Sequence, residues 1–442
     1  MTKVSFISLG CSKNLVDTEV MLHNLHTAGF DITASPEEAE IVVINTCGFI
    51  ESAKAEAIDN ILDAAKLKEW GKCKHIIATG CLVERYREEV MNELPEVDAL
   101  VGVGSLDRIA DACSAVMRGE KYTSFEDKNT SPLGGGRVLT TLPHTAYLKI
   151  AEGCDNLCTY CAIPLIRGKF RSRPIEDIVL EAQRLESTGV KELNLIAQDT
   201  TRYGLDLYGE YSLARLVREI TKATNIPWIR LLYCYPDKIT DELIDELASN
   251  PRLLKYIDIP IQHISDSVLK RMNRHGGQAL IKETVKKLRE RVPGIVLRTT
   301  AMVGFPGETE EDFEELCLFI KEAKFERFGA FTFSPEDDTP AALMDGQIDE
   351  QVKQDRYDCI MQTQLTAIED VLASAVGEIR EVIIDGYDPV AEIYFARSYA
   401  DAPDVDGKVY VRAEKNRYES GDTVTVRLDA ALDYDMLADP VN

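Results

Sequence analysis

The stretch Cys154-Asp155-Asn156-Leu157-Cys158-Thr159-Tyr160-Cys161 decides the fold, because it places three cysteines within eight residues. It follows 146–150, an apolar run with the length of a strand. The cysteines therefore lie where the first βα loop of a barrel is expected. Active sites of such barrels lie at the carboxyl ends of the strands. We expect the three thiols to bind one metal centre at that edge.

Iron–sulfur chemistry fits this spacing better than zinc. Structural zinc sites favour paired Cys-x2-Cys units and a fourth protein ligand. No further His or Cys lies near enough to 154–161 in the chain to complete such a set. Three thiolates can instead hold a four-iron cluster whose fourth iron is free. A structural zinc knuckle is the alternative.

Apolar runs alternate with helical patterns for about 190 residues around this stretch. The candidate strands are 146–150, 192–196, 229–232, 256–261, 296–302 and 328–333. Six strand–helix units predict an open, partial (β/α)6 barrel, because a closed eight-unit barrel needs about 250 residues.

The segment before the barrel predicts a separate α/β domain. Short apolar runs at 4–9, 41–45, 76–79 and 99–103 are separated by helical patterns. This alternation is typical of a parallel sheet with helices on its faces. The polar, Gly-rich stretch 126–137 breaks the pattern and is interpreted as a linker.

The C-terminal part changes character after a long polar helix predicted over 349–373. Strand-like runs at 380–384, 392–395, 408–411 and 423–428 follow one another without intervening helices, which predicts a small antiparallel β-barrel. We therefore expect an α/β multidomain chain with an N-terminal domain over 1–125, a barrel domain over 138–368 and a C-terminal domain over 372–442.

A second group of cysteines follows the strands of the N-terminal domain. Cys11, Cys47 and Cys81 each come one residue after a predicted strand. Parallel strands end at one sheet edge, so these thiols are expected to meet there, beside helix N-termini that favour negative charge. Three thiolates would leave an open coordination position. Three unrelated buried cysteines are the alternative, and buried core thiols are expected for the remaining cysteines, which are Cys73, Cys113, Cys234, Cys317 and Cys359.

Composition excludes several classes of protein. The 442 residues hold 75 acidic and 50 basic side chains, and the formal charge of −25 disfavours generic attraction to nucleic-acid phosphate. No apolar run reaches the ~18 residues of a membrane span. The apolar run 4–10 is too short for a signal peptide. We expect a cytoplasmic protein that does not contact a membrane.

Residues 154–161 resemble the signature of the radical S-adenosylmethionine (SAM) superfamily. The three-cysteine domain in front and the small barrel behind narrow this resemblance to the methylthiotransferases, whose MTTase N-terminal, radical SAM and TRAM domains come in this order. Within that family the chain resembles the RimO type, which acts on ribosomal protein S12. The stretches that carry the resemblance are 9–19, 151–153, 166–173 and 262–266.

The resemblance implies two [4Fe–4S] clusters and SAM as cofactors. The cluster on Cys154, Cys158 and Cys161 would bind SAM and cleave it to a radical that takes hydrogen from the β-carbon of an aspartate of S12. The cluster on the other three cysteines would carry sulfur, and a second SAM would supply the methyl group. Ribosomal protein S12, free or in the small subunit, and an electron donor are the implied partners.

The protein's part in such chemistry is to position and shield its cofactors. An unactivated C–H bond offers no proton to an ordinary base, so no side-chain acid or base is expected to catalyse the reaction. The six histidines are interpreted as ordinary structural or surface residues, and His263 is the candidate for an exception because it lies just past a predicted strand. The resemblance implies a cofactor contact from Tyr160, because it precedes the last cluster cysteine, where this superfamily often has an aromatic residue near the adenine. Further contacts are expected from residues on or just beyond strands, namely Gln198, Asp199, Arg298, Thr300 and Gly304, and an ordinary loop or packing role is the alternative for each of the six.

Basic residues in 166–173 have two interpretations. Arg167, Lys169, Arg171 and Arg173 either offset the charge of clusters and cofactor or form a solvated basic strip.

Two rival functions remain open at this point. A tRNA adenosine methylthiotransferase would share the three domains, but residues 372–442 hold fifteen acidic and seven basic side chains, and a tRNA-binding module is expected to be basic. Direct tRNA binding is therefore not expected. A non-catalytic iron–sulfur factor that docks on ribosomes is the second rival.

Overall fold

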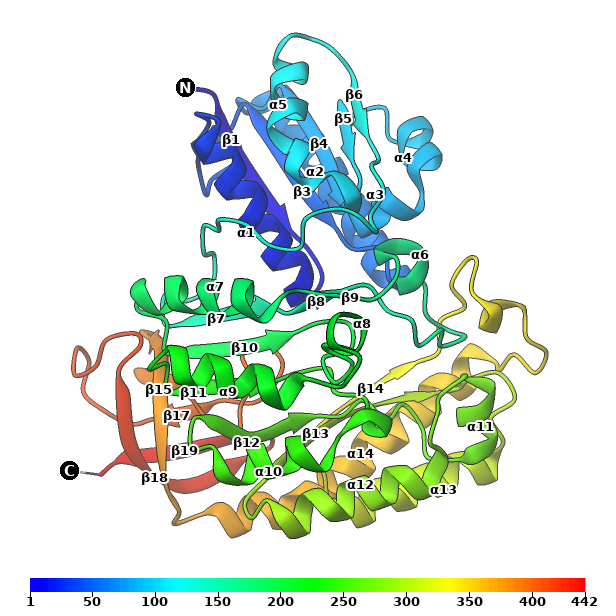
Figure 1. The fold of residues 1–442 in the computed structure, drawn as a ribbon, viewed down its shortest axis with the longest axis vertical. Coiled ribbons are helices and arrows are strands. Elements are labelled where there is room, and N and C mark those ends of the chain that lie inside the picture. Colours follow the sequence, from blue (N-terminus) through cyan, green and yellow to red (C-terminus); the bar gives the residue numbers. More distant parts are fainter. Residues whose placement is uncertain (442) are drawn as a thin grey trace.

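The N-terminal domain is a parallel six-stranded sheet covered on both faces by helices (Figure 1). The computed structural model describes residues 1–441. Its strands are β1 (Lys3–Ser8), β2 (Asp31–Ile32), β3 (Ile41–Thr46), β4 (His75–Gly80), β5 (Ala99–Val101) and β6 (Tyr122–Ser124). Its helices are α1 (Ser12–Thr27), α2 (Glu51–Trp70), α3 (Cys81–Arg85), α4 (Arg87–Glu93) and α5 (Ile109–Met117). The strand order β2-β1-β3-β4-β5-β6 confirms the predicted parallel architecture.

The apolar runs of this sheet form strands because both faces are buried. Every residue of β3 is buried. Val43 and its neighbours on one face pack against α1 and α5. Val42 and Ile44 on the other face pack against α2 and α3. A strand covered on both sides is expected to read as a continuous apolar run rather than an alternating one.

The middle domain is an open sheet of six parallel strands in the order β14-β13-β12-β11-β10-β7. The strands are β7 (Thr145–Lys149), β10 (Glu192–Ile196), β11 (Trp228–Leu231), β12 (Leu253–Asp258), β13 (Val296–Val303) and β14 (Arg327–Thr332). The longer helices are α7 (Ile175–Ser187), α9 (Leu213–Ala223), α10 (Asp241–Ser249), α12 (Gly277–Arg291) and α13 (Glu310–Ala323). The sheet order leaves β7 and β14 at opposite edges, which confirms the predicted partial barrel.

Shorter elements lie near the carboxyl ends of these strands. They are the hairpin β8 (Ala151–Glu152) and β9 (Arg171–Ser172) and the helices α6 (Ile163–Arg167), α8 (Leu205–Tyr208) and α11 (Asp266–Arg271). The strand predicted over 256–261 is displaced in the structure, where β12 ends at Asp258. Pro260 explains the early end, because proline cannot donate a ladder hydrogen bond.

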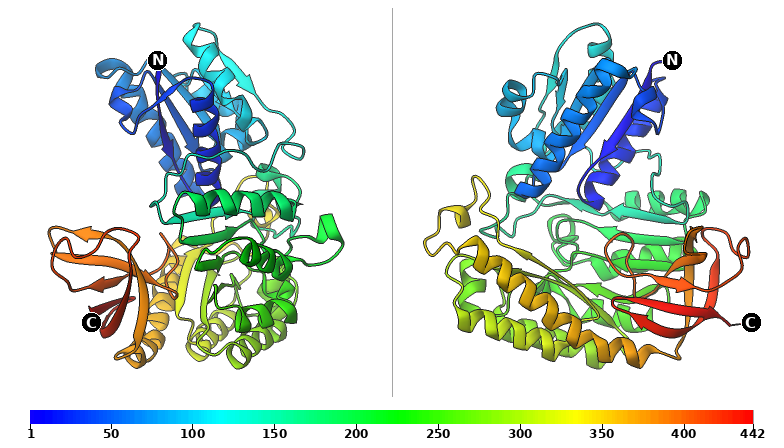
Figure 2. Two further views of the ribbon diagram at one scale, coloured as in Figure 1. Left: turned by 60° about the vertical axis from the view of Figure 1, so that its left-hand side comes forward. Right: turned by 180° about the vertical axis from the view of Figure 1, so that it is seen from behind.

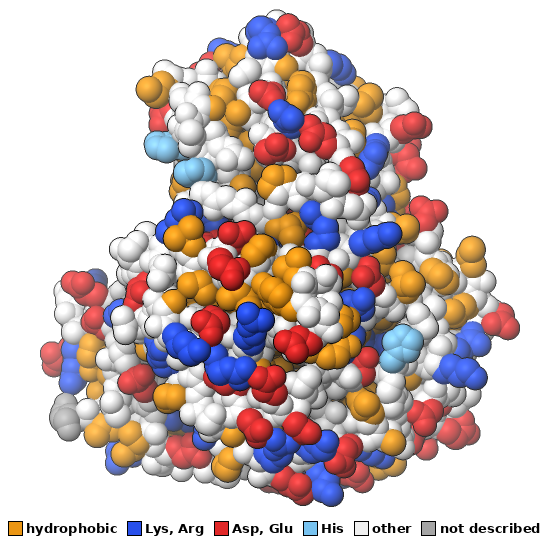
Figure 3. All heavy atoms as spheres, viewed as in Figure 1, with side chains coloured by type: hydrophobic (Ala, Val, Ile, Leu, Met, Phe, Trp, Pro, Cys, Tyr) orange, Lys and Arg blue, Asp and Glu red, His pale blue; other side chains and the backbone are white. Residues whose placement is uncertain are grey.

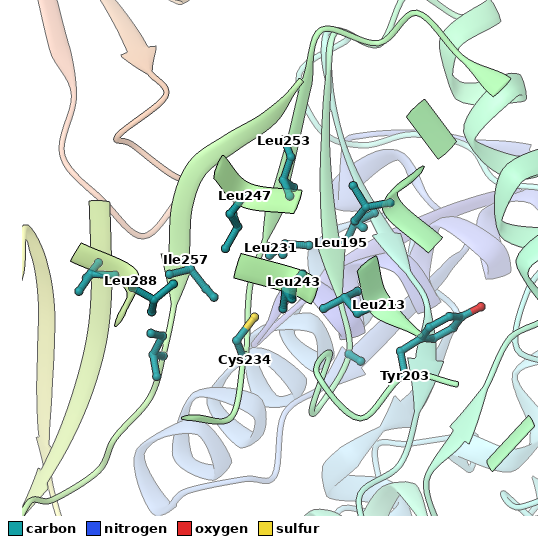
Figure 4. Packing of buried hydrophobic residues seen from close by; sticks show 14 of the residues in the cluster. Leu195, Tyr203, Leu213, Leu231, Cys234, Leu243, Leu247, Leu253, Ile257 and Leu288 are labelled. Atoms are coloured by element: carbon teal, nitrogen blue, oxygen red, sulfur yellow. The ribbon is translucent and has the colours of Figure 1, made fainter. Parts of the chain in front are cut away.

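The main core lies between this sheet and its outer helices. Figure 4 shows Leu195, Leu231 and Ile257 from three neighbouring strands facing leucines of α9 and α10. All of these side chains are fully or almost fully buried. The core therefore fixes the strands whose carboxyl ends carry the candidate site.

The C-terminal domain is a closed five-stranded barrel reached through the long helix α14 (Glu350–Ala375) (Figure 2). Its strands are β15 (Ile379–Asp388), β16 (Ile393–Ser398), β17 (Val409–Val411), β18 (Thr423–Leu432) and β19 (Asp435–Pro440). Four pairings are antiparallel, and β17 pairs with β19 in parallel. The sequence pattern missed β19, whose acidic residues and terminal proline conceal the alternation.

The C-terminal barrel contacts the sheet of the middle domain through the loop between β16 and β17. Ala400 and Ala402 of that loop join a buried cluster with Tyr147 and Tyr256 of the middle domain. The hydroxyl of Tyr256 donates to a carboxylate oxygen of Asp406 at 2.6 Å. Arg298 and Arg327 of the middle domain form ion pairs with Asp406 and Asp401 of this domain, so part of its surplus of acidic residues is neutralised inside the molecule.

The surface carries both signs of charge. Figure 3 shows acidic and basic side chains interspersed on one face rather than gathered into a field of one sign. No helix among residues 1–441 is long and apolar enough to cross a membrane.

Candidate active site and cluster ligands

The first cysteine group lies on the loop between β8 and α6. Cys154 and Cys158 are buried, and Cys161 is half-buried. The backbone N–H of Cys154 donates to the carbonyl of Gly168 at 3.1 Å, and that of Cys161 to the carbonyl of Cys158 at 3.0 Å. Leu157 has a positive φ of 52°, a sparsely populated conformation that concentrates at functional sites. The loop is therefore folded into a defined shape.

The three thiols of this loop lie near one another. Burial raises the pKa of Cys161, and the nearby Cys158 and Cys154 raise it further. Burial likewise raises the pKa of Cys154 to about 11. A positively charged metal centre between the thiols would reverse this penalty, because coordination deprotonates a thiol outright. The hydroxyl of Tyr235 lies 3.4 Å from Cys158 Sγ.

A buried polar cluster supports the loop from beneath. Asn156 Nδ2 donates to Asp199 Oδ2 at 2.8 Å, and Lys238 Nζ donates to the same oxygen at 2.9 Å. Thr201 Oγ1 donates to the other oxygen of Asp199 at 2.7 Å. The structure thus places Asp199 under the cysteine loop with both carboxylate oxygens engaged by protein groups.

Gln198 carries a polar atom that is available to a ligand. Its Nε2 donates to Glu152 Oε1 at 2.7 Å. Its Oε1 is buried and lacks a hydrogen-bond partner among the described residues. Because a buried acceptor is rarely left unpaired without a functional reason, this orphaned oxygen fits a bound cofactor that carries donor groups, such as the amino group of SAM.

The other predicted contact residues divide between two places. Thr300 lines a cavity described below, as does Arg298, whose Nη1 donates to Asp258 Oδ1 at 2.9 Å. Tyr160 packs edge-on against Phe305, with 6.4 Å between ring centroids. It also lines a second cavity, of about 590 Å³, beside β14 and α14.

Gly304 directly follows β13 and has a positive φ of 74°. A Cβ at this position would lie 2.3 Å from Cγ of Lys353. The position therefore needs glycine for both its backbone conformation and the close approach of α14.

The second cysteine group meets at the carboxyl edge of the N-terminal sheet, as predicted. Cys11 precedes α1, Cys47 follows β3, and Cys81 begins α3. A Cβ at Gly10 would lie 3.0 Å from Cys47 Sγ, so only glycine lets these two loops touch. Burial raises the pKa of Cys81 to about 12, and the charges of Cys11 and Cys47 also raise it. The three thiols therefore lie near one another.

Cys11 differs from the other two thiols of this group. It is exposed at the surface. The protein atoms packed around its sulfur would raise its pKa, but Lys13 and Arg167 together with the backbone N–H groups of Lys13 and Asn14 lower it overall. These N–H groups belong to the first turn of α1, where unpaired donors favour an anion. The start of α1 is thus prepared for a thiolate at Cys11.

A cavity of about 480 Å³ joins the three domains. Cys11 and its neighbours form one wall. Residues of β7, β12 and β13, which include Arg298 and Thr300, form a second wall together with the two residues that follow β11. The third wall is the C-terminal loop segment 403–405. The cavity therefore connects the second cysteine group with the interior side of the partial barrel.

The donor set of each cysteine group consists of three thiols. Thiolates are the ligands of iron–sulfur clusters, and three of them can hold a four-iron cluster. A structural zinc site would need a fourth protein ligand. Within residues 1–441, no group of three or more His, Cys, Asp or Glu side chains forms a ready-made site for a single metal ion.

The basic residues of 166–173 do not form a solvated strip. Arg167 and Arg173 are buried, and Arg173 pairs with Glu181. Arg171 donates to backbone carbonyls of the linker, at Ser131 and Lys128. Lys169 is exposed.

His263 is a buried structural residue. The backbone N–H of Ser265 donates to its Nδ1 at 3.0 Å, and burial lowers its pKa to about 4. It is neutral at physiological pH, which agrees with the structural interpretation.

Of the five remaining cysteines, Cys73, Cys113 and Cys234 are buried as expected. The expectation is wrong for Cys359, which is exposed, and only partly right for Cys317, which is half-buried. Cys317 lies on α13 and Cys359 on α14, and neither is among the buried residues of its helix, so the position on the helix decides their exposure.

Sequence reasoning missed several groups around the thiols. Tyr235 follows β11 closely, so the same rule of strand ends that singled out Gln198 could have found it. Lys238 and Asn156 carry no comparable signal, because their burial beside Asp199 depends on how three loops fold together.

Known protein families match the chain in three places. Residues 3–102 match a family described as uncharacterized protein family UPF0004, residues 148–320 match the radical SAM superfamily, and residues 376–441 match the TRAM domain.

Curated relatives match nearly the whole chain and are named ribosomal protein uS12 methylthiotransferase RimO. The protein of Clostridium tetani is 47% identical over 99% of this chain and 98% of its own length. That of Thermoanaerobacter sp. is 47% identical over 99% and 100%. That of Clostridium perfringens is 48% identical over 98% and 97%.

Solved structures share the fold at low sequence identity. The radical SAM methyltransferase TsrM of Kitasatospora setae has a TM-score of 0.57 at 15% identity, with 78% of this chain and 75% of that chain covered. The cobalamin-dependent radical SAM enzyme OxsB has a TM-score of 0.50 at 12% identity, with 84% and 56% covered.

An open parallel barrel with three cysteines in its first loop defines a radical SAM enzyme, which uses an iron–sulfur cluster and SAM. The three domains and the full-length similarity specify it further. The chain belongs to the RimO family of methylthiotransferases, and it is a transferase.

Proposed function

We propose that this enzyme transfers a methylthio group to the β-carbon of an aspartate in ribosomal protein uS12. The relatives that carry this name are 45–48% identical over at least 98% of the chain. Their similarity extends through all three domains, so it includes the surfaces that would receive the substrate as well as the cofactor sites. A cytoplasmic location and an electron donor go with this function.

Two clusters are part of the proposal. Cys154, Cys158 and Cys161 would hold one [4Fe–4S] cluster, and Cys11, Cys47 and Cys81 a second. With SAM bound, these groups supply the radical that activates the β-carbon, the sulfur and the methyl group. The side chains of the protein hold and orient them and exclude water.

The polar groups around Cys154, Cys158 and Cys161, below called the first triad, would bind the cofactor or hold the cysteine loop in place. The free Oε1 of Gln198 is available to accept a hydrogen bond from SAM. Asp199, Asn156 and Lys238 fix the loop by a buried network, so they would act by positioning the thiols rather than by touching the cofactor. A rigid cysteine loop would hold the cluster and the cofactor at a fixed distance and orientation, which the reaction requires.

One observation carries the proposal, namely the cavity between Cys11 and the barrel interior. Cys11, a thiol of the second cysteine group (Cys11, Cys47 and Cys81, below called the second triad), lines the same cavity as Arg298 and Thr300. A side chain of a protein substrate that entered this cavity would lie between the sulfur-carrying and the radical-generating halves of the enzyme.

The rim of the cavity favours a basic protein substrate. Asp404 and Val405 of the C-terminal domain are exposed at its wall. An acidic and an apolar side chain at the entrance suit a positively charged protein partner, since complementary charge steers association. A tRNA would meet repulsion at this carboxylate.

The test is a product assay under anaerobic conditions. The reconstituted enzyme is incubated with SAM, dithionite and either purified uS12, small ribosomal subunits or unmodified tRNA, and the products are analysed by mass spectrometry. We expect one methylthio group on an aspartate of uS12. Modification of tRNA alone would overturn the proposal. Modification of uS12 that survived in Cys158→Ala would overturn the assigned role of the first triad.

A further inference from the structure

Arg167 connects the two halves of the enzyme through a single buried guanidinium. It belongs to α6 of the radical SAM domain and is 2% exposed. Its Nη2 crosses the domain boundary and lies 3.4 Å from Cys81 Sγ. The same nitrogen donates to Asn14 Oδ1 at 2.8 Å. A residue next to the first cysteine loop thus contacts a thiol of the second triad.

The other side of the guanidinium contacts two carboxylates from different domains. Arg167 Nη1 donates to Asp17 Oδ2 and lies 3.4 Å from Glu152 Oε2. Lys149 Nζ bridges the same two carboxylates, at 2.5 Å from Asp17 and 2.8 Å from Glu152. Two cations and two anions therefore compensate one another in a buried cluster, which holds Arg167 in one orientation.

This cluster reaches the candidate cofactor site. Glu152 accepts from Gln198 Nε2 at 2.7 Å, and the other end of that amide is the buried oxygen without a partner. A continuous series of hydrogen bonds therefore runs from Gln198 through Glu152 and Arg167 to Cys81.

We propose that Arg167 is a positioning residue that anchors Cys81 and raises the reduction potential of the cluster bound there. This inference rests on the proposed function, since it requires a cluster on Cys11, Cys47 and Cys81. Reduction adds negative charge to a cluster. A cation that donates a hydrogen bond to a ligand sulfur stabilises that charge, and hydrogen bonding to sulfur is a recognised control of cluster potential.

Burial makes the effect of this contact large. Electrostatic interactions are stronger in the interior than in water, and both Arg167 and Cys81 are almost inaccessible to solvent. Lysine could not replace arginine here, because a single ammonium cannot present the planar fork that reaches Cys81, Asn14 and Asp17 together.

Arg137 provides a matched control. It is also a buried arginine at the boundary of the N-terminal and radical SAM domains, and its hydrogen bonds go to Glu19, Glu181 and the carbonyl of Tyr147. Arg137→Gln removes a cross-domain cation without removing a donor to a cysteine sulfur.

The experiment uses the full chain with Cys154, Cys158 and Cys161 replaced by alanine, so that the second triad alone can bind iron. Arg167→Gln, Arg167→Lys and Arg137→Gln are made in this background. Each protein is reconstituted anaerobically with iron and sulfide, its iron is counted, and its midpoint potential is measured by electron paramagnetic resonance during a potentiometric titration. We expect the midpoint to become more negative in Arg167→Gln, to fall less in Arg167→Lys, and to stay unchanged in Arg137→Gln.

The outcomes separate the inference from the proposed function. A background protein that binds no cluster contradicts the proposed function, and the inference falls with it. A bound cluster whose midpoint is unmoved or raised in the Arg167 variants overturns the inference alone. Equal shifts in Arg167→Gln and Arg137→Gln also overturn it, because any lost domain contact would then suffice. If Arg167→Gln does not bind a cluster, the midpoint potential of Arg167→Lys tests the inference instead. A midpoint potential in Arg167→Lys equal to that of the background protein would overturn the inference.

Discussion

Arg85 of the N-terminal domain and Glu336 of the loop after β14 form a buried ion pair, with 3.0 Å between Nη1 and Oε2. Their side chains are 3% and 2% exposed. The other oxygen of Glu336 accepts from the backbone N–H of Glu51 at 3.0 Å. Because α2 begins four residues after Cys47, this contact joins the loop of a candidate ligand to the radical SAM domain.

Removal of Glu336 is therefore expected to loosen the N-terminal domain. Glu336→Ala leaves Arg85 as a buried charge without its partner, which typically costs about 3–5 kcal/mol. We expect this loss in the free energy of unfolding, together with faster hydrogen exchange at the start of α2. Lys66→Ala is the control, since its pair with Asp63 is exposed and should contribute less than about 1 kcal/mol. Equal losses of unfolding free energy in the two variants would show that the ion pair between Arg85 and Glu336 does not hold the N-terminal domain in place.

His263 predicts a dependence of stability on pH. Burial lowers its pKa from 6.5 to about 4, so the folded protein resists protonation that the unfolded chain accepts. The stabilisation is complete above pH 6.5 and is lost as the pH falls from 6.5 towards 4. The lost free energy is about 3 kcal/mol, at 1.36 kcal/mol per pKa unit.

His263→Asn tests this assignment. Asparagine can keep an acceptor for the N–H of Ser265 but does not titrate. Chemical unfolding at pH 7 and pH 5 should show a smaller difference in this variant than in the wild type. An unchanged difference would show that another group is responsible.

Arg397 is expected to hold the C-terminal barrel on the radical SAM domain. It is buried, and its guanidinium donates to Glu192 at 2.5 Å and to Asp385 at 2.7 Å. Arg397→Gln should cost about 3 kcal/mol and increase hydrogen exchange in β15, β16 and the loop between β16 and β17. Arg412→Gln, in the exposed ion pairs of the same barrel, should have little effect. Unchanged exchange in Arg397→Gln would mean that apolar contacts alone hold the barrel.

Local rules predicted much of the fold and six residues of the candidate site. The sequence alone predicts that Cys11, Cys47 and Cys81 lie close together, because each follows a strand and parallel strands end at one edge of a sheet. The same reasoning located Gln198, whose free oxygen only the structure reveals. Strand β19 escaped because its pattern is broken by acids and proline.

Contacts between domains were beyond such rules. The approach of Arg167 to Cys81 and of Arg85 to Glu336 depends on how whole domains are placed, which no periodicity encodes. Asp199 illustrates the same limit within a domain. Its position after β10 suggested a cofactor contact, whereas its surroundings engage both of its oxygens beneath the cysteine loop.

The central claim is that six cysteines hold two four-iron clusters, and iron and acid-labile sulfide counts after anaerobic reconstitution test it most directly. We expect about eight irons per wild-type chain and about four in Cys158→Ala and in Cys47→Ala. Cys113→Ala, which removes a buried thiol outside both groups, should keep about eight. About four irons in the wild type, or a full count in either ligand variant, would contradict the account.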